Sequence, residues 1–128
     1  MEFMRRKCRK LFQPHQTVCI DEHMVRNKGQ YSFRHIRNKP TKWGMKLWVL
    51  EDSSTGYTYK FDVGKSTATS GFDLAYDVVM NLVKSTVNQG YHLFFDNFYT
   101  SVQLVKDLVG KGIRACGTII ANRKGFPP

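Results

Sequence analysis

Residues 91–95 form a mostly apolar run that constrains the fold of this chain more than any other segment. The run begins after Gly90 and ends at Asp96. Because residues on both alternating faces are apolar, we expect a central β-strand covered on both sides of its sheet. A chain of 128 residues, 41% of them hydrophobic, is long enough to build one domain around such a strand.

Helical patterns precede and follow this strand. Leu74, Val78 and Leu82 recur every fourth residue, which predicts a helix over residues 73–87. Thr100 and Gln103 have the spacing of a capping box, so we expect Thr100 to cap a second helix that ends near residue 110.

Four further strands are expected, at residues 17–21, 43–50, 57–63 and 113–120. Residues 52–56 have the composition of a tight turn, which makes the second and third strands a hairpin. Residues 1–16 are expected to be a basic lead-in, and residues 23–42 a loop. The order of elements favours an α/β fold in which an antiparallel three-stranded meander is followed by right-handed crossovers.

Positive charge is concentrated in the first part of the chain. The formal net charge is +10, and no Asp or Glu lies between residues 26 and 46. Such a cluster favours a polyanion, nucleic acid above all, although a solvated basic surface is the alternative. No apolar run suggests a membrane span or a signal peptide. The candidate DNA-binding residues are Arg26, Lys28, Arg34, Arg37, Lys39, Lys42 and Lys46.

The cysteines, histidines and tryptophans carry weaker signals. There are three cysteines, Cys8, Cys19 and Cys116, and no two of them form a C-x-x-C pair. An odd number without such a pair argues against a disulfide framework and against a zinc site. It favours a reducing compartment. Cys19 and Cys116 are expected to be small buried residues. The histidines lack metal-ligand spacing, and there is no Walker A motif. Trp43 and Trp48 are candidates for base stacking, with a core position equally expected for Trp48.

Two aspartates stand where expected strands end, Asp21 after the first and Asp96 after the fourth. If the two strands are neighbours, both carboxylates can reach one Mg²⁺ or Mn²⁺ ion, since these ions prefer oxygen ligands. The alternative is that Asp21 caps a strand and Asp96 caps a turn. Glu22 should point to the opposite face from Asp21, so we expect it to be a surface acid.

Six blocks of the chain resemble, in order, the conserved blocks of piggyBac-type transposases. The most distinctive is GYHLFFDNFYTS at residues 90–101. The others are DEHMVRNKG at 21–29, KPTKWG at 39–44, GYTYKF at 56–61, the helix YDVVMNL at 76–82, and ACGT at 115–118 followed by NRKG at 122–125. The resemblance covers residues 17–128, which we expect to be a partial RNase H-like transposase domain.

The resemblance implies an RNase H-like mixed sheet, with the five expected strands in the order 3-2-1-4-5, flanking helices and an incomplete C-terminal side. It implies metal-dependent DNA cleavage and strand transfer with Mg²⁺ or Mn²⁺. Asp21 and Asp96 match two of the family's three catalytic, metal-binding acids. DNA as a partner, a homodimer of the full-length protein and a nuclear location are also implied, and no membrane.

The third acid of the family belongs to a helix beyond the NRKG block, and the chain ends at Pro128. We therefore expect a fragment of a transposase catalytic domain that is inactive alone. The alternative is a non-enzymatic, DNA-binding remnant of a transposase that uses only its basic residues.

Overall fold

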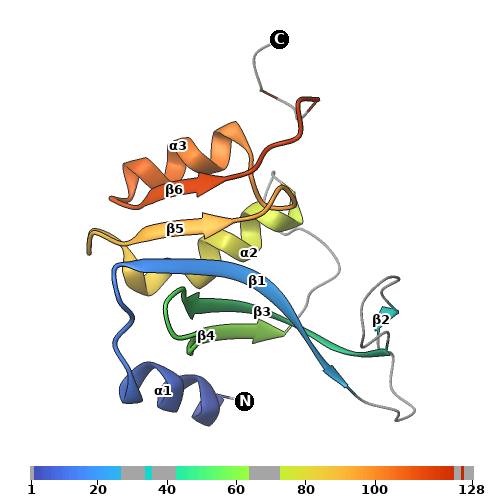
Figure 1. The fold of residues 1–128 in the computed structure, drawn as a ribbon, viewed down its shortest axis with the longest axis vertical. Helices are drawn as coiled ribbons and strands as arrows, with labels where there is room; N and C mark the ends of the chain where they lie inside the picture. Colours follow the sequence, from blue (N-terminus) through green and yellow to red (C-terminus); the bar gives the residue numbers. More distant parts are fainter. Residues whose placement is uncertain (1, 27–33, 36–42, 64–72, 123–124, 126–128) are drawn as a thin grey trace.

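The computed structural model describes residues 2–26, 34–35, 43–63, 73–122 and 125, and a mixed sheet lies at its centre (Figure 1). The strands follow each other in the order β2-β3-β1-β5-β6, and β4 also pairs with β3. The order β4-β3-β1-β5-β6 confirms the expected meander with two parallel strands beside it. The strands are β1 (Thr17–Arg26), β2 (Arg34–His35), β3 (Trp43–Asp52), β4 (Thr58–Val63), β5 (His92–Phe95) and β6 (Arg114–Gly117).

β1 and β3 form a long antiparallel ladder, which runs from Val18 opposite Asp52 to Arg26 opposite Gly44. The prediction that β1 ends at Asp21 is therefore wrong. The expected loop over residues 23–42 is wrong for the last residues of β1 and for β2; its remaining residues lie outside the described ranges. The apolar pattern fades after Asp21, but β3 continues to offer backbone partners, and this tertiary pairing extends the strand.

The hairpin expected between the second and third strands is present as β3 and β4. The Asp52 amide donates to the Tyr57 carbonyl at 3.0 Å, and the Gly56 amide donates to the Asp52 carbonyl at 2.8 Å. Gly56 has a φ of 72°, a left-handed conformation that glycine adopts without steric cost. The turn therefore reverses the chain where the sequence predicted it.

Side chains cap both predicted helices. Asp73 accepts a hydrogen bond from the Tyr76 amide at 2.9 Å, and Ser101 accepts one from the Leu104 amide at 3.2 Å. The predicted capping box is wrong by one residue, because the Thr100 hydroxyl donates instead to the Asp96 carbonyl at 2.8 Å.

The helices are α1 (Glu2–Leu11), α2 (Leu74–Leu82), the 3-10 helix η1 (Lys84–Thr86) and α3 (Val102–Gly110). None of these described helices has the length and apolar character to cross a membrane.

Two elements end earlier than predicted. α2 ends at Leu82 rather than residue 87, and η1 follows it, with the amide and hydroxyl of Thr86 both bonded to the Val83 carbonyl. β6 ends at Gly117 rather than residue 120, because its parallel partner β5 ends at Phe95, directly opposite. A strand needs a neighbour for its backbone groups, so the length of β5 limits β6.

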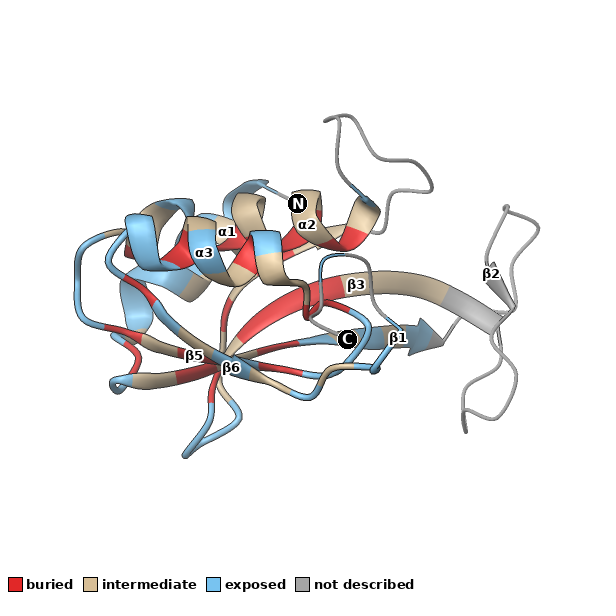
Figure 2. Cartoon of the chain, turned by 90° about the horizontal axis from the view of Figure 1, so that it is seen from above, coloured by how far each residue is buried: buried red, intermediate tan, exposed pale blue. Residues whose placement is uncertain are grey.

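The core lies between the sheet and the helices on one of its faces (Figure 2). Val18, Ile20, Trp48 and Leu93 point into it and are at most 2% exposed. The neighbour Phe94 points to the other face and is 42% exposed. The prediction that β5 is covered on both faces is therefore wrong for the described residues. An apolar run indicates a strand, but it does not indicate which elements pack over each face.

Asp52 at the end of β3 is a fully buried carboxylate, with 0% of its surface exposed. It accepts hydrogen bonds from the amide and hydroxyl of Ser54, at 2.9 and 2.8 Å, and from the His15 ring at 2.5 Å. Burial by itself would raise the pKa of Asp52, but these hydrogen bonds outweigh it and hold the pKa well below the ordinary value. The carboxylate thereby joins the segment before β1 to the β3–β4 turn.

Because the pKa of Asp52 is lower in the folded protein, its charge stabilises the fold above the unfolded pKa of about 3.9, and this contribution disappears as the pH falls through the folded pKa. We predict that Asp52→Asn lowers the Tm at pH 7, and that the difference from the wild type shrinks below about pH 4. Circular dichroism melts from pH 7 to 2 measure this. Asp73→Asn is the control, since Asn caps a helix as well as Asp. Equal melting of Asp52→Asn and wild type at pH 7 would contradict the role of the charge.

Candidate active site and nucleic-acid interface

The two candidate catalytic aspartates lie on neighbouring parallel strands. In the ladder between β1 and β5, Val18 is opposite Leu93 and Cys19 is opposite Phe94. Continued by two residues, this register places Asp21 level with Asp96, and both side chains are exposed. The condition that the sequence set for a shared metal, that the two strands be neighbours, is met.

The two aspartates have different backbone settings. Asp96 directly follows β5 as expected, whereas Asp21 lies inside β1 opposite Val49, so its predicted place at a strand end is wrong. The Asp96 carboxylate accepts the Phe98 amide at 2.9 Å, which is the turn-capping contact considered as the alternative. One such bond leaves further lone pairs on the carboxylate, so turn capping and metal binding are compatible.

Glu22 lies beside the pair and faces the helix side of the sheet, level with Trp48. Glu22 is partly buried, so the prediction of a surface acid is wrong, and its carboxylate accepts a hydrogen bond from the Tyr99 hydroxyl at 3.0 Å. Burial raises the pKa of Tyr99 far above its ordinary value, and the negative charges of Glu22, Asp21 and Asp96 raise it further. Three carboxylates therefore act on one hydroxyl, and this concentration of negative charge favours a nearby cation.

The donor chemistry at this position fits a hard divalent cation only in part. Asp21 and Asp96 offer exposed carboxylate oxygens, the ligand type that Mg²⁺ and Mn²⁺ prefer. In the described part of the chain, however, no group of three or more His, Cys, Asp or Glu side chains is placed to hold a metal ion. These residues therefore supply two ligands, and water or a substrate phosphate would have to complete the coordination.

A stack of two aromatic rings, Trp48 and Phe98, lies beside Asp96, and the sequence did not predict that Phe98 belongs to this site. Phe98 is 43% exposed and lies parallel to Trp48, with ring centres 5.8 Å apart and an interplanar angle of 8°. The Lys46 ammonium is 4.0 Å from the centre of the Trp48 ring, a cation–π contact. Trp48 itself is 1% exposed, which places it in the core. The signal that could have identified Phe98 is its place two residues after a strand-end aspartate.

Three of the seven basic residues predicted to bind DNA lie in described strands, at one end of the sheet. Arg26 in β1 and Arg34 in β2 both lie opposite Gly44 of β3, and Lys46 is two residues further along β3. Figure 1 shows this end of β1, β2 and β3 projecting away from the helices. Lys28, Arg37, Lys39 and Lys42 lie outside the described residues.

The three cysteines are free thiols. Cys19 is partly buried, and this burial, followed by the charge of Glu51, raises its pKa, so the reactive thiolate is disfavoured. Cys116 is exposed, and its expected burial is wrong. It lies on β6, the outermost strand of the sheet, where one side of the strand has no paired neighbour among the described residues.

Comparisons with known proteins identify transposases and transposase-derived proteins as relatives of this chain. A family model described as Transposase IS4 matches residues 1–128. The human PiggyBac transposable element-derived protein 2 is 34% identical over 90 residues, which are 65% of this chain and 15% of that protein. The human PiggyBac transposable element-derived protein 3 is 32% identical over 126 residues, 91% of this chain and 21% of that protein.

A solved structure matches the fold closely. The cryo-EM structure of a piggyBac transposase synaptic complex with hairpin DNA covers 98% of this chain with a TM-score of 0.87 and 29% identity. The match spans 27% of that chain, so this sequence corresponds to a minor part of each of these relatives. The likeness and the strand order confirm the expected RNase H-like α/β fold.

The Tyr99–Glu22 hydrogen bond holds the loop after Asp96 against β1, and its contribution is measurable. We predict that Tyr99→Phe lowers the free energy of unfolding by about 2 kcal/mol, because the acceptor is a carboxylate. Tyr57→Phe, which removes a bond to the neutral Cys8 carbonyl, should cost only about 1 kcal/mol. Urea unfolding gives both values. A smaller loss for Tyr99→Phe than for Tyr57→Phe would contradict this role.

Proposed function

Because the chain belongs to the piggyBac-type transposases, we propose that it forms part of a domain that cleaves and joins DNA strands with divalent metal ions. One observation supports this above the others. Asp21 and Asp96 are exposed and level with each other on neighbouring parallel strands. Carboxylates at this position of an open α/β sheet lie where ligands bind.

In this proposal Asp21 and Asp96 supply two oxygen ligands for Mg²⁺ or Mn²⁺. When bound, the metal would stabilise negative charge on a phosphodiester and lower the pKa of an attacking water. The surrounding residues position the ligands. Phe98 and Thr100 bond to the carboxylate and the carbonyl of Asp96, and Tyr99 joins this turn to Glu22 beside Asp21.

DNA is the partner that this arrangement favours. The solved relative is described as a complex with hairpin DNA, and the projecting strands of this chain carry Arg26, Arg34 and Lys46. Lysine and arginine contacts to phosphates position a duplex without reading its sequence. We further propose that the protein acts as a homodimer in the nucleus, where its substrate is; light scattering and imaging of the tagged protein test these two points.

A third carboxylate would complete the metal site, and the described residues do not place one there. This observation favours a second candidate function, a DNA-binding module that does not cut. The two are separated by incubating the protein with a DNA duplex and Mn²⁺. Salt-sensitive binding without nicking supports the binding module, whereas nicking that Asp96→Asn abolishes supports the nuclease.

Metal binding tests the proposed site independently of cleavage. We predict that the protein binds Mn²⁺ weakly, and that Asp21→Asn or Asp96→Asn lowers the affinity at least about tenfold, because each removes a charged ligand. Electron paramagnetic resonance of free Mn²⁺ during a titration measures the affinity. Asp107→Asn on α3 is the matched control, since it removes the same charge elsewhere and should leave the affinity unchanged. An equal loss in all three variants would show non-specific attraction only.

A further inference from the structure

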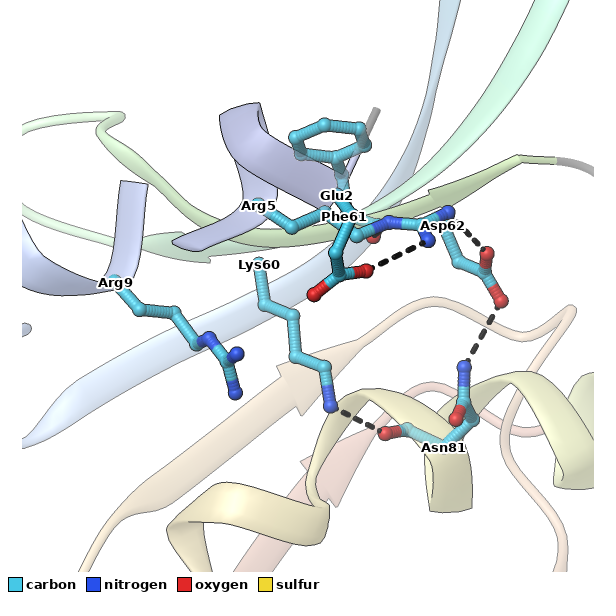
Figure 3. A pocket seen from close by; sticks show the side chains of 7 residues that line it. All are labelled: Glu2, Arg5, Arg9, Lys60, Phe61, Asp62 and Asn81. Atoms are coloured by element: carbon cyan, nitrogen blue, oxygen red, sulfur yellow. Dashed lines mark hydrogen bonds and ion pairs between the residues drawn. The ribbon is translucent and has the colours of Figure 1, made fainter. Parts of the chain in front are cut away.

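A pocket of about 340 Å³ lies at the opposite edge of the sheet from β6, between α1, β4 and the end of α2 (Figure 3). Its lining combines basic and acidic side chains with one amide and one ring. The lining residues are Glu2, Arg5, Arg9, Lys60, Phe61, Asp62 and Asn81.

One side of the pocket is neutralised and held in place. The Arg5 guanidinium is 2.9 Å from the Asp62 carboxylate and also donates to the Phe61 carbonyl at 3.2 Å. The Asn81 side chain donates to the other oxygen of Asp62 at 2.9 Å, which connects α2 to the same carboxylate. Arg5 and Asp62 therefore form a paired wall that joins three elements.

The other side carries two cations, Arg9 and Lys60, against the carboxylates of Glu2 and Asp62, which both line the pocket and are both within ion-pair distance of Arg5. Within the described ranges, neither Arg9 nor Lys60 forms an ion pair, and Figure 3 shows both side chains pointing into the pocket. The Lys60 ammonium donates to the Asn81 carbonyl at 2.8 Å. Burial lowers the pKa of Lys60, the positive charges of Arg9 and Lys84 lower it further, and the charge of Asp62 opposes them in part. Cations that repel each other across an open space define a place where an anion is favoured.

We propose that this pocket binds one phosphate group of the DNA backbone, with the Arg9 guanidinium and the Lys60 ammonium as its donors. The proposal rests on the proposed function, that the chain binds DNA. A guanidinium and an ammonium together offer the donors and charge that a phosphate oxygen pair requires. The Asn81 carbonyl orients Lys60 toward the pocket, and the paired wall of Arg5 and Asp62 keeps the site open.

The pocket and the aspartates lie close together in the sheet, on opposite faces of it. Phe61 of β4 lies opposite Val49 of β3, and Val49 lies opposite Asp21 of β1. Two strand spacings, about 10 Å, therefore separate the backbone at the pocket from that at Asp21. Lys60 faces the helix side of the sheet, as its neighbour Leu50 does, so this phosphate is a different one from any held at the carboxylates.

Salt-dependent binding of a fluorescent DNA duplex tests the proposal. At 0.1 M NaCl, Arg9→Gln and Lys60→Met should each weaken binding roughly fivefold, and each should reduce the slope of log affinity against log salt by about one. The double variant should lose no more slope than either single variant, since both side chains hold the same phosphate. Lys106→Gln, on the exposed face of α3, removes the same charge outside the pocket and should keep the wild-type slope.

Lys60→Met also removes a bond to α2 and could lower the Tm. In that case Arg9→Gln decides the test, because Arg9 is exposed. A slope for Arg9→Gln equal to that of Lys106→Gln overturns the pocket while leaving DNA binding intact. If the wild type binds no DNA, the proposed function fails, and inorganic phosphate becomes the probe. If added phosphate shifts the Arg9 Nε NMR signal, the pocket binds a free anion. If the signal does not shift, the pocket binds no anion. Either result overturns the proposal that the pocket binds DNA.

Discussion

The parallel pairing of β1 with β5 is the constraint on which the rest of this structure depends. Val18 and Ile20 on β1, and Leu93 and Phe95 on β5, are buried beneath the helices, so a slip of one residue would turn apolar side chains toward solvent. The same register brings Asp21 level with Asp96. The hydrophobic core thus determines the position of the two carboxylates, although neither is part of it.

Polar groups join the ends of this sheet to the segments around it. Asp52 connects the segment before β1 with the β3–β4 turn, and Tyr99 connects the turn after β5 with Glu22 on β1. Asp52 is fully buried and Glu22 partly buried, and away from water hydrogen bonds are stronger and an unpaired group is costly. The Tyr99–Glu22 contact holds the loop that carries Asp96 in place without covering the Asp96 carboxylate, which is exposed.

Charge is divided over the surface in a way that suits a polyanion approaching a cation site. Carboxylates gather where β1 meets the end of β5, while basic residues lie on the projecting strands and around the pocket beside α1. Phosphates are attracted by the basic residues and repelled by the carboxylates, unless a divalent cation lies between. In the proposed function, the basic surroundings would therefore hold DNA, and the acidic centre would act on it only with a divalent metal bound.

The sequence by itself determined the strand order and the two helices, and it singled out the two aspartates as candidate ligands. The apolar run before Asp96, the turn at residues 52–56 and the blocks shared with piggyBac-type transposases are local patterns, and local patterns survive in a single sequence. Only the tertiary structure decided the length of β1 and the open face beside Phe94. The length of β1 depends on its pairing with β3, which is distant in the chain, and the open face depends on what packs over the sheet. The capping of α3 by Ser101 is local and follows from the bond of the Thr100 hydroxyl to the Asp96 carbonyl. The Tyr99–Glu22 bond and the pocket of Arg9 and Lys60 join residues that are close only after the sheet has formed.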